Sequence, residues 1–274
     1  VGQGVLWAEA GVSAVATQSF LDPSYGARGL TMMREGASAQ EVLDALVAAD
    51  EGRDVRQVAM IDAHGGVANF TGGRAIAEHC RMAGDSWSVQ ANLMWKTGVC
   101  AAMAKAFEGT AGDLAGRIMA ALDAAQDAGG DIRGRQSAAL LVVGGERGTP
   151  DYEAQKFNLR VDDSREPLAE LRRLLSVARA YGFMDKGDER LAAGDMEGAL
   201  EEYRTAMKMT PDNHEMVFWT AVTLVSAGDI DGAEPFFSRS FSMWPPWREL
   251  VPRLPASGLL PDDPELIERI ANIE

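Results

Sequence analysis

Two stretches, offset by 34 residues, decide the fold of the C-terminal part of this chain: GDMEGALEEYRTAMKMTP at residues 194–211 and GDIDGAEPFFSRSFSMWP at residues 228–245. The pairs that recur at this offset are Gly194 and Gly228, Asp195 and Asp229, Ala199 and Ala233, Tyr203 and Phe237, Met209 and Met243, and Pro211 and Pro245. Small residues let two helices approach closely, an aromatic ring fills the groove between them, and proline ends a helix. The pattern predicts helices over 184–193, 196–209, 214–227 and 230–243.

This period and composition resemble two tandem tetratricopeptide repeats. Two repeats bury little apolar surface by themselves, so we expect neighbouring segments to pack against them. Leu168, Leu171 and Leu175 lie at helical spacing and predict a preceding helix over 167–182. After the repeats, Leu266 and Ile270 predict a short closing helix over 264–271.

Upstream of the repeats, strand patterns and helix patterns mix. Short apolar or alternating runs predict strands at 12–18, 57–62, 67–71, 87–91, 138–143 and 156–161. Helices are predicted after the turn at 22–24, after Ser38 in a capping box with Glu41, and over 96–107 and 112–128. The helices cluster instead of alternating strictly with strands, which favours a layered sandwich over a Rossmann fold. The unbroken apolar run 138–143 predicts a central strand covered on both faces, paired with 156–161.

Charge and length set further limits. The 274 residues suit two units, which we place at 1–165 and 166–274. The net charge is −15, and residues 185–274 alone hold 8 basic and 18 acidic side chains. Such a chain repels phosphate backbones, so we expect no nucleic-acid partner. No apolar run reaches the length of a membrane span, so we also expect a soluble protein with no membrane partner.

The cysteines and histidines give no metal or redox pattern. Cys80 and Cys100 are too few for a disulfide framework, although they could form one bridge. We expect free buried thiols, which favours a cytoplasmic location while leaving export open. The histidines, His64, His79 and His214, are scattered, so we predict no metal site and no cofactor.

Polar residues cluster beside the predicted strands. Asp131, Arg133 and Ser137 lie between the helix that ends at Gly129 and the strand that begins at Ala138. The other clusters contain Gln18, then Gln90 and Asn92, then Arg53 and Arg56. Buried polar groups need partners, and a pocket lined with them would bind a polar substrate. The competing interpretation is a network of turns; it is favoured for the two arginines at 53 and 56, and the choice stays open for Gln90 and Asn92.

Five segments together carry a resemblance to a known family. The stretches 11–30, 56–62, 70–72, 89–92 and 130–140 resemble the Ntn-hydrolase-like family called Domain of Unknown Function 1028. The resemblance covers about residues 1–165. It implies an α+β fold, a four-layer αββα sandwich, followed here by an all-α tetratricopeptide-like tail. In longer family members the tail is labelled peptidoglycan-binding or tetratricopeptide-like.

The resemblance also implies a reaction class. Ntn hydrolases cleave amide bonds with the first residue of the processed chain, whose α-amino group acts as the base. Val1 has neither a hydroxyl nor a thiol. We therefore expect the nucleophile and the first strands to lie upstream, leaving the strand at 12–18 with an unpaired edge. Asp131, Arg133 and Asn92 would support catalysis, and Gln18, Gln90 and Ser137 would bind substrate.

A second interpretation is a non-catalytic binding or scaffold protein that acts through its repeats. For the first interpretation the partner is a small-molecule or peptide-like amide substrate. For the repeats it is a protein or a cell-wall component, and a homo-oligomer is also compatible with them.

Overall fold

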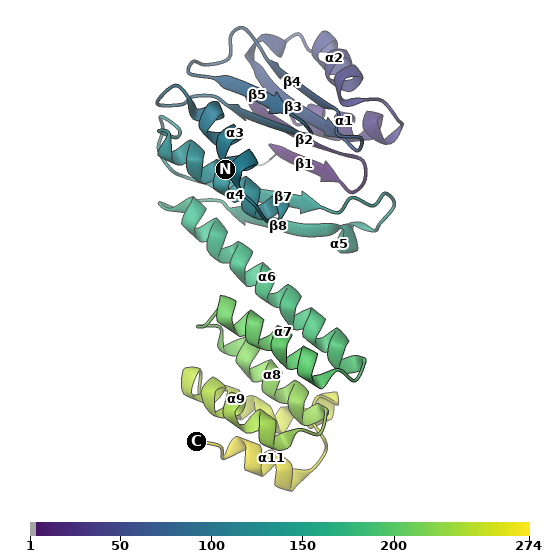
Figure 1. Cartoon of the computed structure of the whole chain (residues 1–274), viewed down its shortest axis with the longest axis vertical. Coiled ribbons are helices and arrows are strands. Elements are labelled where there is room, and N and C mark those ends of the chain that lie inside the picture. The colour runs from purple at the N-terminus through teal and green to yellow at the C-terminus, as the bar shows by residue number, and fades with distance from the viewer. Residues whose placement is uncertain (1–3) are drawn as a thin grey trace. The chain divides into compact units, whose positions relative to one another are not determined.

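The computed structural model describes residues 4–274, so Val1 lies outside the described residues. The chain forms two compact units that divide in sequence between Leu174 and Leu175 (Figure 1). The domain border expected at residues 165 and 166 stays a prediction.

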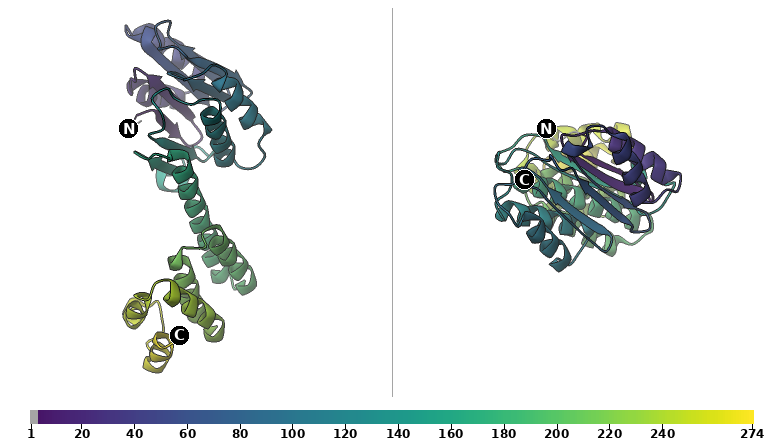
Figure 2. Two further views of the ribbon diagram at one scale, coloured as in Figure 1. Left: turned by 90° about the vertical axis from the view of Figure 1, so that its left-hand side faces the viewer. Right: turned by 90° about the horizontal axis from the view of Figure 1, so that it is seen from above.

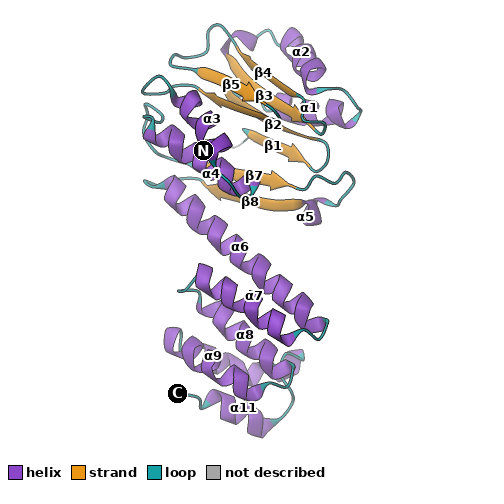
Figure 3. Ribbon diagram, in the orientation of Figure 1, coloured by secondary structure: helices purple, strands orange, loops and turns teal. Residues whose placement is uncertain are grey.

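The first unit combines strands with helices (Figure 3). One antiparallel sheet has the order β1-β2-β3-β4 and contains β1 (Leu6–Glu9), β2 (Ser13–Ser19), β3 (Arg56–Asp62) and β4 (Val67–Thr71). Two antiparallel pairs follow: β5 (Cys80–Gly84) with β6 (Trp87–Ala91), and β7 (Ala138–Val143) with β8 (Gln155–Val161). The helices are α1 (Ser24–Arg34), α2 (Ala39–Ala49), α3 (Val99–Gly109), α4 (Leu114–Asp127) and the short α5 (Asp151–Ala154).

Side-chain alternation along β3 explains how these elements stack. Val58 and Met60 point to one face, where they pack with α1 and α2 in one buried cluster. Gln57 points to the opposite face, where its side chain hydrogen-bonds to backbone oxygens of β5 and β6. Beyond β6, Trp87 and Val89 pack against α3. The layers therefore run helices, sheet, sheet, helices, and helices lie on both sides of the strands in the right-hand view of Figure 2. The α+β fold predicted from the sequence is confirmed.

Local sequence signals set the start of α2. The Ser38 hydroxyl accepts a hydrogen bond from the Glu41 backbone N–H, and the Glu41 carboxylate accepts one from the Ser38 N–H at 2.9 Å. Val42 and Leu46 lie on the inner face and are buried. The predicted capping box is confirmed.

The prediction of an unpaired edge at residues 12–18 is wrong. β2 is paired on both sides, with β3 on one edge and β1 on the other. The chain reverses after β1 through Gly11, whose φ of +63° suits glycine. The reversal brings Leu6 opposite Ala16 and Glu9 opposite Ser13.

The prediction for residues 138–143 is half right. β7 pairs with β8 as expected, but among the described residues β8 is its only strand partner. Only Leu140 of β7 is buried, so β7 is not a central strand covered on both faces. An apolar run identifies a strand here but does not report how deeply the strand is covered. We also did not predict β5, whose residues from Arg81 to Gly84 are exposed and show no inward alternation.

The second unit is helical. Its elements are the C-terminal part of α6 (Pro167–Ala192), then α7 (Met196–Met209), α8 (His214–Ser226), α9 (Ile230–Met243), α10 (Trp247–Leu250) and α11 (Pro264–Ala271). Helices α7, α8, α9 and α11 confirm the sequence predictions. The two helices expected over 167–182 and 184–193 form one helix instead. Gly182 and Gly187 lower helix propensity there, but no proline interrupts the segment.

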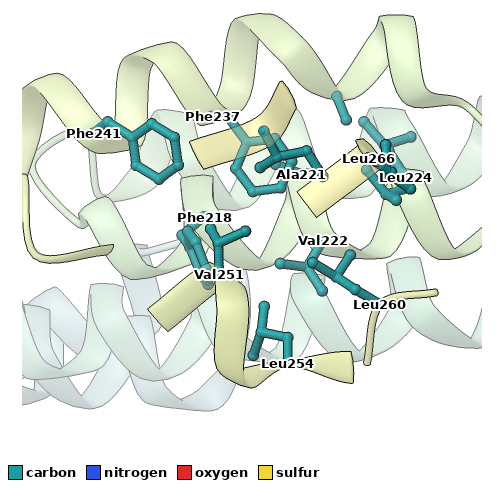
Figure 4. Close-up of a cluster of buried hydrophobic side chains, with 13 residues drawn as sticks. Phe218, Ala221, Val222, Leu224, Phe237, Phe241, Val251, Leu254, Leu260 and Leu266 are labelled. Carbon is teal, nitrogen blue, oxygen red and sulfur yellow. The ribbon is translucent and has the colours of Figure 1, made fainter. Parts of the chain in front are cut away.

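The repeat positions pack as the 34-residue period requires. Ala199, Ala233, Tyr203 and Phe237 are all fully buried. Figure 4 shows the larger cluster, in which Phe237 and Phe241 of α9 face Phe218 of α8. Val251, Leu254, Leu260 and Leu266, from the segment after α9, complete the cluster. The closing segment therefore covers apolar surface that two repeats alone would leave exposed.

Candidate ligand-binding cavity in the first unit

One cavity of about 650 Å³ lies in the first unit, and its lining includes the six residues to which the sequence analysis gave a role in catalysis or substrate binding, but neither Arg53 nor Arg56. These are Gln18 at the end of β2, Gln90 in β6, Asn92 just after β6, and Asp131, Arg133 and Ser137 between α4 and β7. The strands and loops that supply them are far apart in sequence. The structure thus brings the six residues to one place; their roles in binding or catalysis stay predictions.

The turn after α4 positions Asp131. Gly129 and Gly130 have φ values of +132° and +65°, which let the chain leave the helix sharply. The following segment then runs beside residues 93–95. The Trp95 N–H donates to Gly130 O, and the Ile132 N–H donates to Leu93 O, both at 2.9 Å. Asp131 is therefore held next to the segment that carries Asn92.

Asp131 and Arg133 form a two-point ion pair. Arg133 Nε lies 2.9 Å from Asp131 Oδ1, and Arg133 Nη2 lies 2.6 Å from Asp131 Oδ2. Burial alone would raise the pKa of the Asp131 carboxyl, but the hydrogen bonds from Arg133 outweigh it and the pKa is lowered. The Arg133 side chain is 70% exposed, so this pair lies at the rim of the cavity.

Behind two of the lining residues, Gln18 and Asn92, the fully buried amide of Gln57 joins the two sheets. Gln57 Nε2 donates to Thr71 Oγ1 at 3.1 Å and to the backbone oxygens of Cys80 and Ala91, each at 3.2 Å. Gln57 Oε1 accepts hydrogen bonds from Gln18 Nε2 at 2.6 Å and from Asn92 Nδ2 at 3.2 Å. Gln57 was not among the predicted site residues. The sequence nevertheless contains an indication of its role. Gln57 directly precedes the apolar residues of β3, and a glutamine buried in such a strand needs hydrogen-bond partners.

Two residues at the cavity hold an unusual backbone conformation. Ser19 has φ +68° and Leu93 has φ +57°, in a region that residues with a side chain rarely adopt. The Ser19 hydroxyl is buried and makes no hydrogen bond within residues 4–274. Strained backbone and unpaired buried polar groups gather at functional sites, where the surrounding fold holds them.

Arg56 does not line this cavity. Its Nε lies 2.9 Å from Asp50 Oδ2, and its Nη1 donates to the backbone oxygen of Phe20. The Tyr25 hydroxyl donates to the same Asp50 oxygen at 3.1 Å. The hydrogen bond from Arg56 lowers the pKa of Asp50, against the effect of burial. Arg56 thus acts on structure, by fixing the loop that follows β2, which supports the turn-network interpretation for this residue.

The expectation of free thiols is wrong. Cys80 of β5 and Cys100 of α3 form a disulfide, with their Cα atoms 6.0 Å apart. The residues lie 20 positions apart in the sequence, and the bridge forms because α3 packs directly on β5 and β6. Among residues 4–274, no three His, Cys, Asp or Glu side chains are grouped so as to hold a metal ion.

The repeat unit has a larger cavity, of about 810 Å³, lined by residues that include Asp188, Leu191, Met196 and Trp219. Its lining lacks the convergent set of amides and charges found in the first unit. We therefore place the candidate small-molecule site in the first unit, although its cavity is the smaller one.

The protein thus consists of a layered α+β unit, which holds a polar cavity, and a unit of helical repeats that follows it in the sequence. The chain belongs to the family of unknown function DUF1028, whose model matches residues 1–171. Residues 184–245 match a tetratricopeptide repeat model. A crystal structure of a Silicibacter pomeroyi protein, also described as DUF1028, is 28% identical and superposes with a TM-score of 0.57. The match covers 64% of this chain and 73% of that one.

No curated protein matches the chain significantly. Within residues 4–274, no helix is both long and apolar enough to cross a membrane.

Proposed function

We propose that the first unit binds an amide-containing small molecule or short peptide in its cavity and serves as the substrate-binding body of an amide hydrolase of the N-terminal-nucleophile class. One observation carries the proposal: six polar residues chosen from the sequence alone line one cavity of about 650 Å³. This volume suits a ligand of drug or dipeptide size. The layer order of helices, sheet, sheet and helices is the arrangement that the resemblance implies.

The described lining of this cavity supplies polar groups for binding but no side chain of the type that commonly activates a nucleophile. Ser19 and Ser137 line the cavity, yet its described lining contains no histidine, lysine or cysteine that could activate them. The resemblance assigns the nucleophile to the first residue of the processed chain. In that case Asp131, Arg133 and Asn92 act by holding the substrate amide and the attacking group.

The polar lining of the cavity also favours a second candidate function, a protein that binds its ligand without converting it. In both cases the repeat unit would dock a protein or a cell-wall partner. The repeat unit holds its own cavity, and its excess of acidic side chains favours a basic partner surface.

The test uses the natural gene product and a panel of amino-acid amides and dipeptides. We expect at least one compound to raise the melting temperature and to be cleaved, as followed by mass spectrometry. Asp131→Asn should abolish cleavage, whereas Asp127→Asn, at an exposed position near the end of α4, should not. Binding without cleavage would favour the second candidate, and the absence of any binding would contradict both.

A further inference from the structure

The orientation of the buried amide of Gln57 is fixed by its surroundings. Its Nε2 faces the backbone oxygens of Cys80 and Ala91, each at 3.2 Å. Backbone carbonyl oxygens only accept hydrogen bonds, so the nitrogen of the amide has to point at them. The oxygen of Gln57 must then point the other way, toward Gln18 and Asn92.

This orientation in turn fixes two amides of the cavity wall. Gln57 Oε1 can only accept, so Gln18 and Asn92 have to present their NH₂ groups to it, at 2.6 Å and 3.2 Å. Their own oxygens, Gln18 Oε1 and Asn92 Oδ1, accept no hydrogen bond within residues 4–274. Both residues line the cavity, and no described group donates a hydrogen bond to these two acceptors.

Gln90 adds a third acceptor. Its Nε2 donates to the backbone oxygen of Ala16 at 3.1 Å, which fixes this amide as well. Gln90 Oε1 is buried and has no hydrogen-bond partner within the described part of the chain. A buried acceptor without a donor is unfavourable, so a bound group that donates to it would be stabilised.

The cavity thus joins an acceptor wall to an apolar wall. The acceptor wall, as we define it, consists of the oxygens of Gln18, Gln90 and Asn92. The same lining includes the apolar side chains of Leu93, Met94, Val99, Met103 and Leu122, which we call the apolar wall. An ammonium group has three donors and a positive charge, and so it matches three acceptor oxygens. A carboxylate or phosphate would meet unpaired oxygens there, and the guanidinium of Arg133, which also lines the cavity, is already paired with Asp131.

We propose that the acceptor wall recognises the protonated amino group of a ligand whose body is apolar, such as an amino-acid amide with an aliphatic side chain. This proposal rests on the proposed function, which it narrows to substrates with a free amino group. Gln57 is a positioning residue, because it acts through Gln18 and Asn92.

The test compares three probes of similar shape by calorimetric titration of the natural gene product: L-leucinamide, N-acetyl-L-leucinamide and 4-methylpentanoate. We expect L-leucinamide to bind at least tenfold more tightly than the other two. Its affinity should fall as the pH rises above about 8, where an α-amino group loses its proton. Asn92→Leu should lower the affinity for L-leucinamide about tenfold and leave the acetylated probe unaffected.

Asn158→Leu, at an exposed position on β8, is the matched control and should change neither affinity. Equal or tighter binding of the acetylated or carboxylate probe would overturn the ammonium assignment while leaving the cavity as a binding site. Failure of all three probes to bind would overturn the proposed function and this inference with it. Because Gln57 is fully buried, the test relies on Asn92, which is partly exposed, so that loss of folding does not obscure the result.

Discussion

The two units bury polar groups in opposite ways. In the repeat unit, the buried hydroxyls of Thr220 and Ser240 donate to backbone oxygens four and three residues back in the same helix. In the first unit, the side chain of Gln57 bonds to residues between 14 and 39 positions away. A hydroxyl satisfied within its own helix leaves the core free to be apolar. An amide whose partners lie in four other strands, β2, β4, β5 and β6, ties the layers together and helps to shape a cavity.

The backbone shows the same contrast. Among the described residues, the non-glycine residues with positive φ are Ser19, Ser86 and Leu93, all of which lie in the first unit. Two of them line the cavity. Regular packing of helices gives the repeat unit no such positions. Strain and unpaired polar groups in the first unit therefore mark a place where the fold accepts a cost in stability.

The largest effect is expected from truncating the core of the repeat unit. Phe237 is fully buried between Phe218 and Phe241, with ring centroids 5.8 and 5.6 Å away. Phe237→Ala should lower the unfolding free energy of this unit by roughly 3–5 kcal/mol, since a large cavity remains. Hydrogen exchange measured by mass spectrometry, which reports on each unit separately, should show the loss in residues 196–271.

The conservative change Phe237→Leu serves as the control and should cost considerably less. In both variants the exchange of β2, β3 and β6 should stay as it is in the wild type. Equal loss of protection in both units would mean that they unfold together, and the contrast drawn between them would not hold for stability.

The next largest effect on stability is expected from removal of the disulfide in the first unit. The bridge between Cys80 and Cys100 closes a loop between residues 20 positions apart, and loop entropy alone gives a stabilisation of roughly 3 kcal/mol. Replacing both cysteines by alanine should destabilise the first unit by about this amount. Denaturant unfolding with and without a reductant checks it: the reductant should weaken the wild type and leave the double variant unchanged. A reductant-insensitive wild type would show that the bridge does not form in solution.

The contrast between the units also explains which structural features could be predicted from the sequence. Helices α7, α8, α9 and α11 were predicted to within about a residue of their observed bounds. Their signals are local, since small residues, aromatic rings and prolines recur within one period. The signals for capping at Ser38 and for the neighbouring strands β3 and β4 are local as well, and the cap and both strands were predicted.

Features that depend on distant partners were missed or misjudged. The partners of Gln57 are set by the packing of two sheets, which no spacing in the sequence reveals. The bridge between Cys80 and Cys100 depends on α3 lying over β5. The six predicted site residues nevertheless line one cavity, because polar residues at strand ends come together when the strands pack; their roles stay predictions. The sequence could not predict the direction in which each amide points, on which our proposal for the ligand rests.

The smallest expected effect is a difference between the two units in how their stability depends on pH. In the first unit Arg56 lowers the pKa of Asp50, whose side chain is only 14% exposed. In the repeat unit the Gly198 N–H and Arg190 lower the pKa of Asp195, but this carboxylate is about half exposed and screened by water. A carboxylate with a lowered pKa stabilises the fold above its unfolded pKa of about 3.9. That contribution to stability is lost as the pH falls through the lower pKa that the carboxylate has in the folded state.

Asp50→Asn should therefore cost the first unit on the order of 1 kcal/mol at pH 6, where the wild-type carboxylate is charged and paired. At pH 3 the difference from the wild type should shrink, because the wild-type carboxylate then takes up a proton as well. Asp195→Asn should have little effect at either pH, since asparagine caps a helix as well as aspartate does. Chemical unfolding at the two pH values measures both differences. The unfolding free energies of Asp50→Asn and the wild type could instead differ by the same amount at pH 6 and pH 3. Asp50 would then stabilise the first unit through its shape and not through its charge.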